Sequence, residues 1–144
     1  MTLTDLGKKL NTLADNLPTN ASTLVKKVAE DVHTHVVVYT PVKTGKARSN
    51  WLVTLREDSS DVIPTHGVEG SISTTLNEGR SVIQNAKKGD SIHIVNNVDY
   101  IGELNEGSST QAPAGFVQSA VVSAVESIEA VSYTHLTLPT ILRV

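Results

Sequence analysis

The stretch TNASTLVKKVAEDVHTHVVVYT, residues 19–40, decides the fold because its apolar residues recur at helical spacing. Thr19 or Asn20 can cap a helix, and Pro41 ends it because the residue before a proline avoids the helical conformation. The stripe predicted to be buried consists of Ala21, Val25, Val28, Val32, Val36 and Tyr39. We therefore expect a long helix over residues 21–39.

Weaker patterns flank this helix on both sides. Leucines at spacings of four and three predict a short helix over residues 4–14. A polar loop over 41–50 leads into residues 51–56, whose alternation of side chains indicates a strand. The other expected elements are short strands over 62–63 and 68–72, a helix from a Thr75 capping box to a Gly89 end, a strand over 91–95, helical turns over 100–106, and a helix with Pro113 near its start and its stripe ending at Val131.

This order of elements predicts an α+β fold. We expect a small, mostly antiparallel sheet, packed by the long helix of the N-terminal half and by a C-terminal helix. Abundant Val, Ile and Thr suggest that the sheet carries much of the core. A chain of 144 residues can form one core without disulfides, so we assign a single domain to residues 1–131.

The C-terminal tail, residues 132–144, has a different character. Its sequence SYTHLTLPTILRV shows no helical period, and Pro139 blocks a long regular element. It could be an extended arm that reaches a neighbouring subunit, a disordered end, or a stretch foreign to the natural gene. Because the amino-acid sequence of the tail resembles translated sequencing-adapter read-through, we favour a stretch foreign to the natural gene and exclude the tail from functional argument.

Composition excludes several classes of protein. The absence of cysteine excludes disulfide scaffolds, cysteine-ligated metals and thiol catalysis. No apolar run approaches the length of a membrane span. Five aromatic residues are too few for a protein that stacks single-stranded bases, and a net charge of −3 does not indicate a general nucleic-acid binder.

Charge is distributed unevenly along the chain. Up to Arg56 there are eight basic and four acidic residues, whereas residues 57–131 hold three basic and eleven acidic ones. The two parts are either two solvated faces of one fold, or edges by which the basic side of one subunit meets the acidic side of the next. Head-to-tail contacts of the second kind generate rings.

Motifs for catalysis or metal binding are missing from the sequence. His33 and His35 are two apart on the expected helix and so point in different directions, and the other three histidines have no ligand at a recognised spacing. Gly45 and Lys46 lack the rest of a phosphate-binding loop. We therefore predict no catalytic residues, no cofactor and no metal, and an enzyme whose residues converge only in three dimensions is the weakest alternative.

Two segments resemble the signatures of one family. TPVKTGKARSNW, residues 40–51, and NNVDYIGELNEGSS, residues 96–109, followed by QAPAGFV, are similar to the signature loops of tailed-bacteriophage neck and tail-completion proteins. The resemblance covers roughly residues 21–131. The family usually has an acidic residue at Lys43 and an Arg at Lys46, so this loop is more basic than is typical; it also usually has a Met at Phe116.

The resemblance implies a non-enzymatic virion protein of the phage neck, which joins the head connector to the tail as an oligomeric ring around the DNA path. We expect a homo-oligomer, with a hexameric ring favoured. Its partners would be the head connector or adaptor and the tail terminator or tail tube. It would lie at the head–tail interface of the virion, and in the host cytoplasm during assembly.

The signature segments also supply the candidate site residues. Lys43, Lys46 and Arg48 are predicted to contact a neighbouring subunit or passing DNA, or else to form an exposed basic loop without a partner. The predicted structural anchors are Pro41, Gly45, Trp51, Asn97 and Tyr100: Pro41 ends the helix, Gly45 allows a tight turn, Trp51 anchors the first strand in the core, and Asn97 and Tyr100 tie the second loop to the sheet. In the plainer interpretation, Trp51 and Tyr100 are simply core residues. The alternative function is a nucleic-acid-binding module that uses the basic loop 43–48, with affinity that falls steeply with salt.

Overall fold

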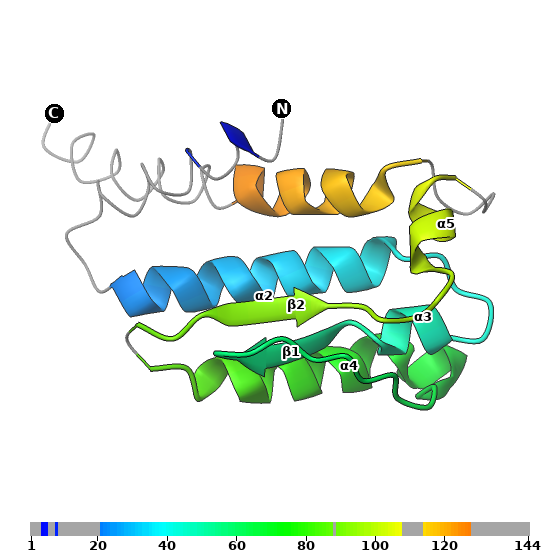
Figure 1. The fold of residues 1–144 in the computed structure, drawn as a ribbon, viewed down its shortest axis with the longest axis horizontal. Coiled ribbons are helices and arrows are strands. Elements are labelled where there is room, and N and C mark those ends of the chain that lie inside the picture. Colours follow the sequence, from blue (N-terminus) through cyan, green and yellow to red (C-terminus); the bar gives the residue numbers. More distant parts are fainter. Residues whose placement is uncertain (1–3, 6–7, 9–20, 88, 108–113, 128–144) are drawn as a thin grey trace, which may run out of the picture.

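The computed structural model describes residues 4–5, 8, 21–87, 89–107 and 114–127. The labelled elements are α2 (Ala21–Tyr39), α3 (Lys46–Ser49), β1 (Leu52–Leu55), α4 (Gly67–Gln84), β2 (Ile92–Val95) and α5 (Ile101–Asn105), and residues 116–127 form a further helix (Figure 1). The α+β class is confirmed. Most of the helix predicted over 4–14, the proposed caps at 19 and 20, Pro113 and the tail 132–144 lie outside the described residues.

Helix α2 spans the residues predicted for it, but its buried face coincides with the predicted stripe only in part: Val36 is buried, and Val32 is partly buried against the core. Val25 and Tyr39 are 44% and 39% exposed. The buried residues of the helix are Ala29, His33, Val36 and Val37. Three consecutive valines at 36–38 place apolar groups on several faces, so the spacing alone does not fix which face turns inward.

The sheet consists of β1 and β2, which pair antiparallel with Leu52 opposite Val95 and Val53 opposite Ile94. Val53 is 8% exposed and packs on Ala29 and Ile83 of the helices. Two strands of four residues each cannot supply a core for this chain, so the expectation that the sheet carries much of the core was wrong.

The helices supply most of the buried core instead. In Figure 1, α2 lies between residues 116–127 and the level of β1 and α4. One cluster of buried residues joins these layers through Val36, Val37, Trp51 and Ala120, and a second contains Ala29, Val53 and Ile83. From residues 116–127, Phe116, Ala120, Ala124 and Val125 are buried.

Helix α4 is the largest departure from the predicted elements. The sequence predicted strands over 62–63 and 68–72 and a helix starting at Thr75, yet residues 62–63 are irregular and one helix spans Gly67–Gln84. Thr75 lies inside this helix and is 3% exposed, so the capping box was wrong. Gly89 has a φ of 89° but does not cap the helix, which ends at Gln84 with Asn85 as its C-cap residue.

The short connections agree better with the predictions. The expected loop over 41–50 contains one helical turn, α3, which the sequence did not predict. Helix α5 and the left-handed Gly107, with a φ of 100°, confirm the predicted helical turns over 100–106. These connections carry both signature segments.

Candidate interaction site

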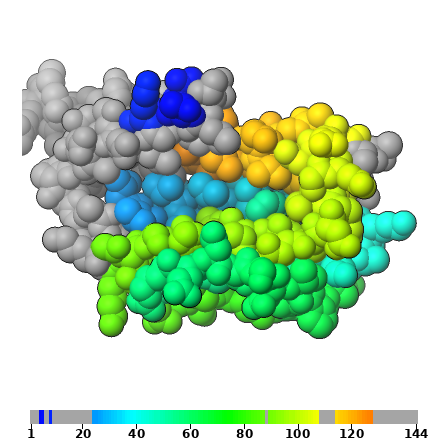
Figure 2. Space-filling view, in the orientation of Figure 1, coloured from blue at the N-terminus to red at the C-terminus, as the bar shows by residue number. Residues whose placement is uncertain are grey.

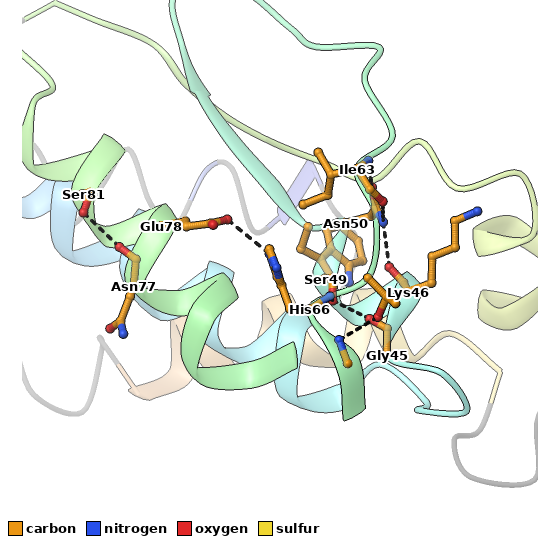
Figure 3. A network of polar contacts seen from close by, with 12 residues as sticks. Gly45, Lys46, Ser49, Asn50, Ile63, His66, Asn77, Glu78 and Ser81 are labelled. Carbon is orange, nitrogen blue, oxygen red and sulfur yellow. Dashed lines mark hydrogen bonds and ion pairs between the residues drawn. The ribbon is translucent and has the colours of Figure 1, made fainter. Parts of the chain in front are cut away.

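Gly45 sets the geometry of the first signature segment. Its φ of 82° is left-handed, and a Cβ at this position would collide with the Gly67 carbonyl at the start of α4. The predicted tight turn is therefore confirmed. Ser49 holds the next turn by donating to the Gly45 carbonyl at 2.6 Å, while its Oγ accepts from the His66 amide at 3.0 Å (Figure 3).

Asn50 fixes the chain beyond the strand, although nothing in its sequence context singled it out. Its side chain is fully buried. The Nδ2 group donates to the carbonyls of Lys46 at 2.8 Å and Ile63 at 3.0 Å, and Oδ1 accepts from the Ile63 amide at 2.7 Å. The side-chain amide of Asn50 thus satisfies both backbone groups of Ile63, as a neighbouring strand would, and holds that residue beside α3 (Figure 3).

Trp51 is confirmed as a core anchor at 8% exposure. Its Nε1 donates to Thr40 Oγ1 at 2.7 Å, just before Pro41, where α2 has ended as predicted. His33 Nε2 lies 2.8 Å from the Trp51 carbonyl. Burial lowers the pKa of His33, although the Trp51 carbonyl acts in the opposite direction. Since a carbonyl only accepts, the neutral imidazole carries its proton on Nε2.

Arg48 has a structural role that the sequence did not reveal. Its Nε donates to the Val37 carbonyl at 3.1 Å, and Nη2 reaches the carbonyls of Val38 at 3.4 Å and Thr40 at 3.1 Å. These bonds cap the C-terminal end of α2. Partial burial lowers the pKa of the guanidinium, which stays charged. Its contact with a subunit or DNA stays a prediction.

Lys43 and Lys46 are the available charges of the basic loop. Lys43 is exposed and Lys46 is half-buried. Figure 3 shows the Lys46 side chain extending away from the surrounding contacts. Within the described part of the chain, neither amino group has a hydrogen-bond or ion-pair partner.

The second signature segment meets the first. Asn96 Nδ2 donates to the Ala47 carbonyl of α3 at 2.8 Å. Asn97 Nδ2 donates to the carbonyls of Ser59 at 2.8 Å and Asp61 at 3.1 Å, so it ties its loop to the segment after β1 rather than to the sheet. Tyr100 is 37% exposed, and its hydroxyl has no hydrogen-bond partner among the described residues. Its predicted tie to the sheet and the alternative place in the core were therefore both wrong; Val98, at 2%, occupies the core instead.

A cleft of about 270 Å³ opens between β1, residues 59–63 and α4. We call it the β1–α4 cleft. Its lining is Ser49, Trp51, Leu52, Val53, Thr54, Ser59, Asp61, Ile63, Thr75, Glu78, Gly79 and Val82. Asn50 and Asn97, one from each signature segment, hold the wall formed by 59–63. In the space-filling view, the chain just after β1 lies on the outer face beside β2 and α5 (Figure 2).

Two exposed carboxylates, Asp61 and Glu78, belong to the lining of this cleft. Glu57 and Asp58 are exposed carboxylates on the chain that follows β1. Asp58 pairs with His93 Nδ1 at 2.6 Å. Glu78 Oε2 lies 3.3 Å from His66 Nε2, but the geometry is not that of a hydrogen bond, and Nε2 has no such partner among the described residues.

The chemistry of a hydrolase is not assembled here. Ser49, His66 and Glu78 are the residue types of a catalytic triad, but Ser49 Oγ bonds the backbone of Gly45 and His66, not an imidazole ring. Among the described residues, no three side chains of His, Asp or Glu gather as a metal site would require. No helix in that part of the chain is long and apolar enough to cross a membrane.

Comparisons with protein-family models, curated proteins and solved structures found no match to this chain.

Proposed function

We propose that this protein is a structural component of the phage neck, which joins the head connector to the tail as a homo-oligomeric ring around the DNA path. The observation that carries the proposal is the junction of the two signature segments. Asn96 joins them directly through the Ala47 carbonyl, and Asn50 and Asn97 together hold residues 59–63. The two segments that carry the sequence resemblance therefore lie side by side and support the same part of the fold.

The distribution of charge supports a ring. The unpartnered cations of the basic loop belong to the first signature segment, and exposed carboxylates border the β1–α4 cleft. Two different surfaces of opposite charge on one subunit suit a head-to-tail contact, whose repetition about an axis closes a ring.

The finer features of the proposal follow from the resemblance. We favour a hexamer, which would contact the head connector or adaptor on one side and the tail terminator or tail tube on the other. The protein would act without catalysis in the virion neck and assemble in the host cytoplasm. Lys43 and Lys46 are the residues we assign to the subunit contact or to passing DNA.

Electron cryomicroscopy of the purified full chain tests this function. Class averages should show closed rings with a central channel wide enough for duplex DNA. Filaments, or dimers with two-fold symmetry, would contradict the ring. The nucleic-acid-binding alternative would gain if no ring formed and if the chain bound duplex DNA with an affinity that fell steeply with salt.

A further inference from the structure

We infer that the β1–α4 cleft receives the Lys46 side chain of a second copy of this chain. The inference deepens the proposed function and rests on it, because it names the two surfaces that meet in the ring. Three observations carry it: the chemistry of the cleft, an unpartnered hydroxyl inside it, and the direction in which Lys46 extends.

The chemistry of the cleft matches a long basic side chain. A lysine combines an apolar stem of four methylene groups with a charged end, and it binds best where both are accommodated. Trp51, Val53 and Val82 give the cleft an apolar lining. Asp61 and Glu78 are exposed carboxylates of the same lining and can accept hydrogen bonds from an ammonium group.

Thr75 provides an independent indication of an occupant. The residue is 3% exposed and lines the cleft, and its Oγ1 has no hydrogen-bond partner among the described residues. A buried hydroxyl without a partner is costly, and a docked polar group would remove that cost.

The edge of β1 beside the cleft offers further polar groups. Because the Arg56 amide donates to the Ser91 carbonyl at 2.8 Å, the alternation of an antiparallel ladder directs the Val53 amide and carbonyl away from β2. An extended segment that enters the cleft could therefore also bond backbone groups of β1.

The occupant comes from another copy because Lys46 does not face its own cleft. In Figure 3 the Lys46 side chain extends away from Glu78, which lies on the opposite side of the network. One subunit therefore presents the basic side chain in one direction and the acidic cleft in another. That arrangement fits successive subunits of a ring.

Carbodiimide coupling of the unmodified full chain tests the contact directly, because it joins an amine to a carboxylate where the two groups touch and leaves Lys46, Asp61 and Glu78 in place. Isotope-labelled and unlabelled chains are mixed, so that mass spectrometry identifies which residues are joined between two copies. We expect the Lys46 amine to couple to Asp61 or Glu78 of the other copy at least about tenfold more often than the Lys87 amine does. Lys87 is an exposed lysine outside the basic loop.

Failure of the contact and failure of the ring give different results. If Lys46 couples to neither carboxylate of the other copy more often than Lys87 does, the inference is overturned, even if the protein forms rings. Frequent coupling of Lys46 without any ring would support the contact and contradict the proposed neck ring.

Discussion

The side chain of Asn50 pairs with the backbone of Ile63 in both directions. Its Nδ2 donates to the Ile63 carbonyl at 3.0 Å, and its Oδ1 accepts from the Ile63 amide at 2.7 Å. A residue of the first signature segment thereby positions a wall of the β1–α4 cleft that lies 13 residues further along the chain.

Replacing the Asn50 side chain should destabilise the fold. We expect Asn50→Ala to lower the free energy of unfolding by about 2–4 kcal/mol, because it leaves the backbone groups of Lys46 and Ile63 without partners in a buried setting. Urea unfolding measures the loss. Asn85→Ala removes a single exposed bond to the Ser81 carbonyl and should change stability by about 0.5 kcal/mol or less. Equal losses would show that Asn50 has no special role.

Helix α4 contains two glycines with opposite expected responses. A Cβ at Gly79 would overlap the His33 ring, so Gly79→Ala should destabilise the protein by about 1–3 kcal/mol. A Cβ at Gly70 would lie 3.5 Å from Thr74 Oγ1, an ordinary contact. Gly70→Ala should therefore stabilise the helix by up to about 1 kcal/mol. Thermal unfolding separates the two, and a stabilising Gly79→Ala would contradict the packing of His33 on α4.

Acid should destabilise the fold through His33. Burial holds the pKa of His33 below its ordinary 6.5. As the pH falls below about 6.5, the unfolded chain takes up a proton at this residue before the folded chain does, so the free energy of unfolding falls. The fall continues down to the lowered pKa of the folded state. Urea midpoints at about pH 7.5 and pH 5.5 measure it.

The variant His33→Gln isolates this contribution from those of the other histidines. Glutamine can still donate to the Trp51 carbonyl but does not titrate. We expect it to be less stable than the natural protein at neutral pH and to lose less stability on acidification. The same pH dependence in both proteins would assign the acid effect to another group.

Arg48 and Lys46 should differ although both are cations of the basic loop. Arg48→Met keeps the stem but leaves the α2 carbonyls uncapped, so it should lower the free energy of unfolding by about 1–3 kcal/mol. Lys46→Met should leave unfolding within about 0.5 kcal/mol of the natural protein and weaken assembly instead. Urea unfolding of both variants measures stability, and sedimentation measures assembly, so together they test whether the two residues have these different roles. A Lys46→Met protein that assembles normally would remove this residue from the contact.

Sequence periodicity predicted the elements whose buried faces are apolar. Helix α2 and both strands follow such patterns, and so does the helix over 116–127. Helix α4 does not, because its fully buried residues are Ser71, Thr75, Gly79 and Ile83, spaced by four but mostly small or polar. A stripe of that kind has no apolar signal, although its spacing of four could have indicated a helix.

The candidate site was predictable only in part for a similar reason. The conformation of Gly45 and the burial of Trp51 follow from residue type and context. The roles of Asn50 and Arg48 depend on backbone groups that tertiary structure brings to them, at Ile63 and at the end of α2. Tyr100 was predicted to tie the second loop to the sheet, but it is 37% exposed, and the buried residue of this loop is Val98.

The mass of the assembly formed by the purified full chain tests the central claim most directly. Native mass spectrometry at high protein concentration and low salt should show a closed oligomer, with six copies of the 15.4 kDa chain favoured. Raising the salt should dissociate it, because the proposed contact joins opposite charges. A chain that remains monomeric under these conditions would contradict the account.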